Sequence, residues 1–245
     1  MELEISTLAQ RPDAVGKLWE MPSPWPEIMR HDPIGNLFYG QVTDFFPEYV
    51  LLVSNGSGEL IAQAFAAPFQ MTEDELFDDG WDGVLRRALN TRLDGRTPNA
   101  VSAIEIAIRP DHQGKGLSGR VLAAMRENVS RLGFRELFAP VRPNGKQDPG
   151  QPMSEYALQV RADGLPVDPW LRVHVRAGGR IDRIAPRSMV IPGTLAEWRD
   201  WTGLPFDTSG PVVVPHALAP VHCDVAQNQA VYVEPNVWVR HTLTT

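Results

Sequence analysis

The chain has 245 residues and one cysteine, Cys223, which excludes an intrachain disulfide and any zinc site built from several cysteines. His216, His222 and Cys223 read as part of one strand, where the two histidines are roughly 20 Å apart, so we expect no metal site. No apolar run approaches 18 residues, so no membrane contact is expected. The acidic start, Met1–Glu4, lacks the features of a signal peptide, and we expect a cytoplasmic protein.

Positive charge is also in short supply. The 23 Lys and Arg residues face 30 Asp and Glu residues, which gives a formal net charge of −7. A negative surface is repelled by nucleic-acid phosphates and anionic lipids, so neither is expected as the main partner. Hydrophobic residues make up 43% and charged residues 22% of the chain. This composition is typical of a folded, soluble protein, and the length allows one large domain.

The most regular part of the sequence is a strand, a helix and a second strand. Ser102–Ile108 alternates with a period of two and predicts a strand. Helical spacing of apolar residues predicts a helix over 117–132, ended by Gly133. Phe134–Val141 is the next predicted strand, so these elements form a parallel βαβ unit. We therefore predict an α/β (α+β) fold, with a mixed, mostly antiparallel sheet around one central parallel pair and helices on both faces.

The flanking segments predict the rest of that sheet and its helices. Short helices are expected within 10–46, and two β-rich runs over 48–65 surround an Asn/Gly/Ser turn and predict an antiparallel hairpin. The other expected elements are helices over 72–89, 153–162, 168–177 and 194–201, and strands over 180–191, 212–224 and 230–240. Scattered prolines confine the last two strands to edges or bulges.

A glycine-rich loop, Gln113–Gly119, precedes the helix of the βαβ unit. Glycines let backbone N–H groups approach a ligand, and a helix N-terminus attracts anions, so a diphosphate is the expected ligand. Gly114, Gly116 and Gly119 also match the dinucleotide-binding pattern Gly-x-Gly-x-x-Gly. Against this alternative, Arg109–Gln113 separate the strand from the loop. A turn that only reverses the chain is a further alternative, and the Walker pattern is absent.

The stretch Ile104–Ser118 resembles motif A of the GNAT superfamily of acyl-CoA-dependent N-acyltransferases, in which Pro-x-x-Gln/Arg-x-x-Gly-x-Gly/Ala lies between a strand and a helix. The departure is Ser118, where Gly or Ala is usual. The resemblance covers about residues 48–180. It implies that acetyl-CoA or another acyl-CoA binds with its diphosphate on the loop and its pantetheine arm along the strand. The implied binding residues are Ile106, Ile108, Gln113, Gly114, Lys115, Gly116, Leu117, Ser118, Gly119 and Asn144, the last of which also suits a simple turn.

The implied reaction, aminolysis of a thioester, needs a neutral amine, a stabilised carbonyl oxygen and a proton for the departing thiolate. A backbone bulge near Ile106 would serve the carbonyl oxygen. His174 takes the place where the family often has a tyrosine acid, and Tyr156 is the second candidate; otherwise His174 is a plain helix-face residue and Tyr156 a packing residue. Glu105 is the candidate base because burial raises a carboxyl pKa. Its alternative role is a salt bridge to an arginine on a helix.

We expect one GNAT-like domain over 1–245, with an acceptor side in 1–47, the sheet and acyl-CoA core in 48–145, and insertions within 146–245. The expected acceptor is an amine of a small molecule or peptide, and a homodimer is allowed for. Trp170–His174 also resembles GNAT-like domains of polyketide loading modules. The alternatives are therefore a decarboxylase or S-acyltransferase that acts on malonyl-CoA or a carrier-protein thiol, and an acyl-CoA-binding module without turnover.

Overall fold

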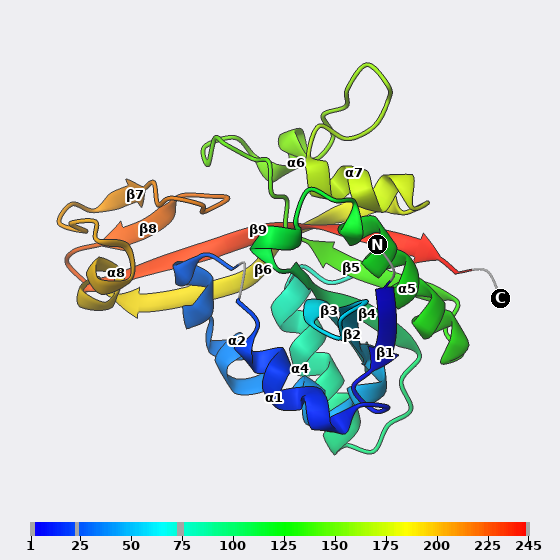
Figure 1. Ribbon diagram of the computed structural model, residues 1–245. Coiled ribbons are helices and arrows are strands. Elements are labelled where there is room, and N and C mark those ends of the chain that lie inside the picture. Colours follow the sequence, from blue (N-terminus) through cyan, green and yellow to red (C-terminus); the bar gives the residue numbers. More distant parts are fainter. Residues whose placement is uncertain (1–2, 23–24, 73–75, 244–245) are drawn as a thin grey trace.

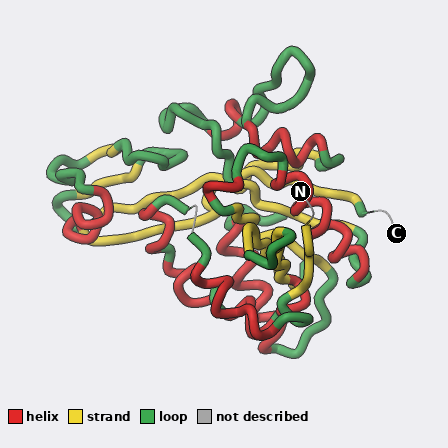
Figure 2. Tube along the Cα trace, viewed as in Figure 1, coloured by secondary structure: helices red, strands yellow, loops and turns green. Residues whose placement is uncertain are grey.

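The computed structural model describes residues 3–22, 25–72 and 76–243, and its strands form one nine-stranded sheet. The strands are β1 (Leu3–Thr7), β2 (Val50–Asn55), β3 (Leu60–Phe69), β4 (Ala100–Ile108), β5 (Glu136–Val141), β6 (Arg180–Thr194), β7 (Gly210–Val212), β8 (Val221–Asp224) and β9 (Gln229–Thr242). Their order is β1-β2-β3-β4-β5-β9-β8-β7, and β6 pairs with β9 off this path (Figures 1 and 2). The β4–β5 pair is parallel and the other pairs are antiparallel, so the predicted mixed sheet is confirmed.

Helices cover both faces of this sheet. The α-helices are α1 (Val15–Glu20), α2 (Pro33–Phe38), α3 (Gln41–Phe45), α4 (Gly80–Leu93), α5 (Leu117–Arg131), α6 (Met153–Tyr156), α7 (Pro169–Arg176) and α8 (Leu195–Thr202). Short 3-10 helices are η1 (Pro12–Ala14), η2 (Glu27–His31), η3 (Pro47–Tyr49) and η4 (Pro110–His112). Helix α4 packs against β3 and β6, whereas α5 packs against β4 and contacts α7 (Figure 1). The predicted β4–α5–β5 unit is therefore present, with Gly133 at φ +97° just after the helix.

The structure corrects several predicted boundaries. Helix α4 begins at Gly80 and not at 72, and residues 73–75 lie outside the described residues. Gly80 has φ +30°, and a Cβ there would lie 2.2 Å from the Oγ atom of Ser188, so the helix starts where the chain passes β6 closely. The helix expected over 153–162 is the single turn α6. A turn at Gly164, φ +76°, follows it.

The C-terminal half is built on a long antiparallel ribbon of β6 and β9, from whose far end β7, β8 and α8 project (Figure 1). The strand expected over 212–224 is in fact the hairpin β7–β8, which turns at His216 with φ +67°. Strand β1 was not predicted, because a five-residue edge strand with mixed polarity has no clear pattern. Helix α8 begins at Leu195, one residue after the predicted start, and its N-cap Thr194 forms a capping box with Glu197.

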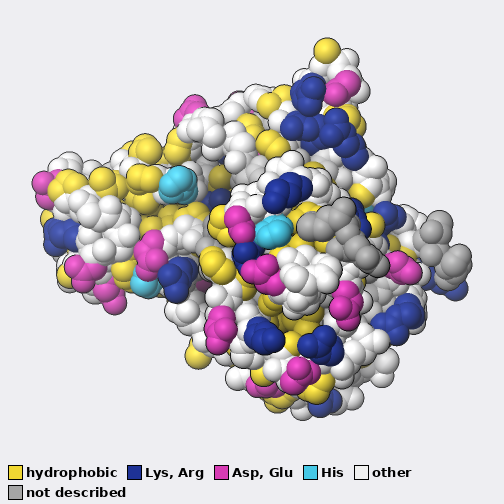
Figure 3. All heavy atoms as spheres, in the orientation of Figure 1, with side chains coloured by type: hydrophobic (Ala, Val, Ile, Leu, Met, Phe, Trp, Pro, Cys, Tyr) yellow, Lys and Arg dark blue, Asp and Glu magenta, His cyan; other side chains and the backbone are white. Residues whose placement is uncertain are grey.

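Two features concern contact with nucleic acids and membranes: the distribution of surface charge and the character of the helices. On the face shown in Figure 3, acidic and basic side chains are interspersed over most of the surface. Among the described residues, no helix combines the length and the apolar character that crossing a bilayer requires.

Candidate active site

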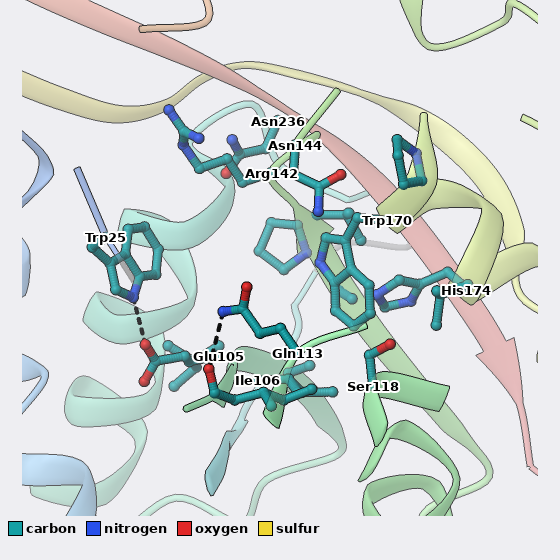
Figure 4. Close-up of a pocket in the computed structure, with 18 of the residues that line it drawn as sticks. Trp25, Glu105, Ile106, Gln113, Ser118, Arg142, Asn144, Trp170, His174 and Asn236 are labelled. Carbon is teal, nitrogen blue, oxygen red and sulfur yellow. Dashed lines mark hydrogen bonds between the residues drawn. The ribbon is translucent and has the colours of Figure 1, made fainter. Parts of the chain in front are cut away.

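A cavity of about 420 Å³ lies between the carboxyl-terminal ends of β4 and β5 (Figure 4). These parallel strands pair at Ser102 and Phe138. Further along β4, Ile106 and Ile108 line one side of the cavity, and Ala139–Val141 of β5 lines the other. Two strands that diverge leave backbone groups facing a gap, with which an extended ligand can pair as an added strand. Both isoleucines predicted to bind a ligand thus lie on the cavity wall.

The glycine-rich loop forms the mouth of this cavity. Gly114 and Gly116 have φ angles of +73° and +71°, the left-handed region that favours glycine. Gly116 is the N-cap of α5, whose first turn carries no acidic side chain, so the positive end of the helix dipole is not neutralised locally. Gln113, Gly114, Leu117 and Ser118 line the cavity. The loop can therefore hold an anionic group against the helix N-terminus.

Three predicted loop residues lie elsewhere. Lys115, Gly116 and Gly119 are not among the residues that line the cavity. The Nζ atom of Lys115 donates to the backbone oxygen of Asp111 at 2.9 Å. Gly116 shapes the loop through its backbone, and Gly119 belongs to the first turn of α5. Backbone amides, more than the lysine charge, are thus what the loop offers to a ligand at this cavity.

Strand β4 carries a backbone bulge beside the cavity. Glu105 and Ala103 lie opposite consecutive residues of β3, so Ile104 is the extra residue. The Nε1–H group of Trp81 donates to the Ile104 carbonyl at 3.0 Å and fixes the bulged peptide. The bulge predicted near Ile106 is therefore present two residues earlier.

Asp168 connects the loop after β5 with helix α7. Its Oδ1 atom accepts hydrogen bonds from the backbone N–H groups of Trp170 and Leu171, both at 2.9 Å, and so caps the N-terminus of the helix. Its Oδ2 atom accepts from the N–H groups of Asn144 and Gly145 at 3.0 and 2.7 Å. Asn144 and Trp170 both line the cavity. One carboxylate thus positions two parts of the cavity wall.

Tyr156, the second candidate for the acid, is bound to the same carboxylate. Its hydroxyl group donates to Oδ2 of Asp168 at 3.1 Å, and Tyr156 does not line the cavity. Burial and the Asp168 charge raise the pKa of Tyr156 well above its ordinary value. The structure therefore places Tyr156 in the support of α7, away from the cavity.

His174 lies on α7 with its ring at the cavity wall, beside Trp170 (Figure 4). The two ring centroids are 4.6 Å apart, and Nδ1 of His174 is 2.9 Å from Nε2 of His241 in β9. Burial, and then the neighbouring His241, lower the pKa of His174 to about 3, and burial and Arg126 lower that of His241 to about 4. This value for His174 lies well below the ordinary value of 6.5. A ring with a pKa of about 3 is neutral at pH 7 and can act there as a hydrogen-bond donor.

Glu105 also lines the cavity, on the side covered by the N-terminal helices. Its carboxylate accepts a hydrogen bond from the Trp25 indole N–H (Figure 4) and a second one from the Tyr39 hydroxyl group. These two partners replace the helix arginine that the alternative interpretation required. Burial raises the pKa of Glu105 above its ordinary value, and the hydrogen bonds oppose that shift. A carboxyl group in this setting suits the uptake of a proton.

The sequence analysis missed a polar network at the edge of the cavity. Arg142 donates through Nε to both oxygens of the fully buried Glu234, at 3.1 and 2.9 Å, and Asn236 donates to Glu234 at 3.0 Å. Ser188 donates to Asn236 at 2.6 Å and accepts from the backbone N–H of Trp81 at 2.8 Å. Arg142 follows β5 directly, at the end of a parallel strand where ligands often bind, and that position was the available signal.

Two further buried carboxyl groups, Asp32 and Asp82, lie close to this network. Burial raises the pKa of Asp32 to about 6, and the charge of Glu234 adds to that shift. Burial, and then the charge of Asp32, raise the pKa of Asp82 to about 8. Asp82 accepts from the Val190 N–H at 3.2 Å. Carboxyl groups are therefore concentrated at this side of the molecule.

Comparisons with known proteins agree with this geometry. No model of a protein family matches the chain. It is 33% identical to "Arginine N-acetyltransferase avaD" from Aspergillus versicolor over 271 aligned positions, which cover 98% of this chain and 93% of that protein. Its fold is similar to that of the loading GNATL domain of CurA from Lyngbya majuscula, with a TM-score of 0.61, 16% identity and coverage of 99% and 98%. The fold is also similar to that of the GphF GNAT-like decarboxylase in complex with isobutyryl-CoA. The TM-score is 0.59, the sequence identity is 15%, and the match covers 100% of each chain.

The histidine pair makes a prediction about stability in acid. Both folded pKa values, about 3 and about 4, lie below the ordinary value of 6.5. The unfolded chain therefore binds more protons below pH 6.5, and the stabilisation that the pair gives above that pH is lost as the pH falls. Each histidine should contribute about 2 kcal/mol to the fall in unfolding free energy between pH 7 and pH 5.

Urea unfolding at both pH values measures this contribution. The double variant His174→Gln, His241→Gln should lose less stability between pH 7 and pH 5 than the parent protein does. His222→Gln is the control, since His222 is exposed on β8, and it should keep the parent's pH dependence. A double variant with the parent's pH dependence would contradict the assignment of two neutral buried rings.

Proposed function

This chain belongs to the GNAT superfamily of acyl-CoA-dependent N-acyltransferases, and from that membership we propose which amine it acylates. It transfers an acyl group from acyl-CoA to an amine. We propose that the donor is acetyl-CoA and that the acceptor is arginine, or a small molecule with an arginine-like guanidinium group. The relative named as an arginine N-acetyltransferase supports this choice, and so does the chemistry of the cavity.

The cavity between β4 and β5 is the observation that carries the proposal. The extended pantetheine arm can pair with the backbone of Ile106 and Ile108, because β4 and β5 diverge beyond Ser102 and Phe138 and no longer pair there. The loop at Gly114 and the N-terminus of α5 suit the diphosphate. This arrangement directs the thioester towards the region between Glu105 and His174, which lie on different walls of the cavity (Figure 4).

The acceptor side of the cavity suits a guanidinium group. Trp25 and Trp81 line it with ring centroids 5.9 Å apart, and indole faces attract cations. Asp32, whose pKa of about 6 leaves it mostly ionised at pH 7, places negative charge near this wall. Arg142 lines the same cavity and can pair with the carboxylate of an amino acid. Arginine carries both of the charges that these groups complement.

The proposed transfer follows from these positions. An alkyl ammonium must first lose a proton, which costs roughly 4 kcal/mol at pH 7, and Glu105 accepts that proton. The neutral nitrogen then attacks the thioester carbon, and amides at the Ile104 bulge stabilise the oxygen. The carbon–sulfur bond breaks, and the second proton of the nitrogen passes to the thiolate. His174 donates a hydrogen bond to the sulfur during this step.

A direct assay tests the acceptor. The purified protein is mixed with acetyl-CoA and with arginine, lysine or leucine; released thiol is measured, and the acetylated product is identified by mass. We expect N-acetylarginine, with a kcat/KM for arginine at least about tenfold above that for leucine, since about 1.4 kcal/mol of charge recognition suffices for that ratio. Equal values for the three amino acids would refute recognition of the guanidinium group.

The same assay separates the alternative functions. Release of CO2 from malonyl-CoA without added amine would indicate a decarboxylase. Tight binding of coenzyme A with no thiol release from any acyl-CoA and amine would indicate a binding module without turnover. Either result would overturn the proposal.

The loop makes a prediction about coenzyme A affinity. Ser118→Asp adds a carboxylate in the first turn of α5, where it repels a diphosphate but favours the helix dipole. We expect the Kd for coenzyme A to rise about tenfold or more, with no loss in unfolding free energy. Calorimetry and urea unfolding measure the two quantities. Ser118→Ala is the control and should bind within about threefold of the parent; an unchanged Kd in Ser118→Asp would place the diphosphate elsewhere.

Glu105 makes a prediction about rate and pH. Glu105→Gln keeps the size of the side chain but cannot take up a proton, so kcat should fall about 100-fold at pH 7 with little change in the KM for acetyl-CoA. The deficit should shrink as the pH rises towards the pKa of the amine, because the acceptor then needs no base. Steady-state kinetics from pH 7 to pH 10 measure both effects.

The control for this variant is Glu127→Gln, which changes an exposed carboxylate on α5. It should show the kinetics of the parent protein at every pH. A deficit in Glu105→Gln that stays constant across the pH range would assign Glu105 a structural role and not that of the base.

A further inference from the structure

His241 is a buried histidine that the proposed mechanism leaves without a role. It lies on β9, is fully buried and does not line the cavity. Its Nε2 atom is 2.9 Å from Nδ1 of His174, a residue 67 positions away in the sequence. Two neutral imidazole rings at this distance share one hydrogen bond, so one ring donates and the other accepts.

The chain leaves space for this contact at Gly179. A Cβ atom at Gly179 would lie 2.6 Å from Cε1 of His241 and 2.8 Å from the backbone oxygen of His174. Its backbone N–H donates to that same oxygen at 2.9 Å. A larger residue here would collide with both histidine segments, so their observed packing requires a residue without a side chain.

Two arrangements of the shared proton are open to the pair. In the first, His241 donates Nε2–H to Nδ1 of His174, and the single proton of His174 is on Nε2. In the second, His174 donates Nδ1–H, its Nε2 atom carries no proton, and the proton of His241 is on Nδ1. Since Nδ1 of His174 is occupied by His241, Nε2 is the nitrogen that remains for the cavity.

The surroundings of His241 favour the first arrangement. In the part of the chain that the structure describes, its Nδ1 atom is buried and has no hydrogen-bond partner, and the same holds for the Nε–H donor of Arg126. The charge of Arg126 acts on His241 and disfavours added positive charge there. A bare ring nitrogen is compatible with a nearby cation, whereas a buried N–H group without an acceptor is costly and faces the same charge.

We propose that His241 is a positioning residue for the acyl transfer, which donates Nε2–H to Nδ1 of His174 and thereby holds the His174 proton on Nε2, towards the cavity. The role in catalysis rests on the proposed function. With this tautomer, His174 donates a hydrogen bond to the sulfur of the departing coenzyme A. The opposite tautomer would present a lone pair to the thiolate and repel it.

The tautomer can be measured without any turnover. The chain has six histidines, so ¹⁵N-histidine labelling gives a spectrum in which each ring is resolved by its two-bond couplings. The signals of His174 are assigned by their loss in His174→Gln. At pH 7 we expect His174 of the parent protein to carry its proton on Nε2 and His241 likewise. A proton on Nδ1 of His174 would overturn the proposal.

Kinetics of two variants test the consequence. His241→Leu removes the donor, and kcat should fall about 10- to 100-fold with the KM for acetyl-CoA within about threefold of the parent. His241→Gln can place an amide N–H near the former Nε2 position, and its kcat should lie within about threefold of the parent value. The His174 signals of His241→Leu should show a mixture of tautomers, and those of His241→Gln the parent tautomer.

The outcomes distinguish the two proposals. If the parent acetylates no amine but His174 has the expected tautomer, then the proposed function fails and the positioning by His241 stands as a structural fact. If the parent is active and His241→Leu retains its kcat and its tautomer, the positioning role is refuted. Equal losses in His241→Leu and His241→Gln would show that only the packing of the imidazole ring matters.

Discussion

The carboxylate of Asp168 is the interaction on which the wall of the cavity depends. It is almost fully buried and accepts hydrogen bonds from four backbone N–H groups and one hydroxyl group. Two of these donors begin α7, and two belong to the loop that leaves β5. Because both oxygens of this buried carboxyl group accept hydrogen bonds, the loop and the helix are fixed relative to each other. His174 lies on α7 one helical turn beyond Trp170, so the hydrogen bonds of Asp168 also fix its position.

The cavity also depends on the gap between β4 and β5. Where the two strands no longer pair, side chains form hydrogen bonds with the backbone of β4. Gln113 donates its side-chain N–H to the Ile108 carbonyl at 3.1 Å, and Trp81 donates to the Ile104 carbonyl. These bonds satisfy backbone oxygens that a continuous parallel ladder would otherwise occupy. Pro140 in β5 has no N–H group to offer to β4. The cavity is thus maintained by side chains from the loop and from α4.

The sequence predicted the parts of the molecule that local patterns specify. The strand predicted over 102–108, the helix that ends at Gly133 and the loop between them follow from alternation, helical spacing and glycine chemistry. The resemblance to motif A then directed attention to Gln113 and Ser118, and the structure places both on the cavity wall. His174 and Glu105 also line the cavity.

Long-range contacts were beyond the reach of the sequence. The partners of Glu105 come from 66 and 80 residues away, and the partner of His174 from 67 residues away. No periodicity or spacing in one sequence reports such pairs, and among the described residues Trp25 and Tyr39, in place of an arginine, donate to the Glu105 carboxylate. The sequence also does not report the burial that lowers the pKa of His174 or the hydrogen bond that joins Tyr156 to Asp168.

In the proposed mechanism, the acceptor amine and the thioester meet in one cavity whose two sides differ in charge. On the acceptor side, Glu105 is buried and hydrogen-bonded to Trp25 and Tyr39, and Glu234 is ion-paired with Arg142. On the thioester side, His174 and His241 are kept neutral by burial. A neutral N–H group stabilises a thiolate as it forms but does not attract the acceptor's carboxylate or bind the free thiolate as an ion pair. In the proposed mechanism, the neutral pair favours release of coenzyme A after the bond has broken, which a permanently charged residue in the same place would slow.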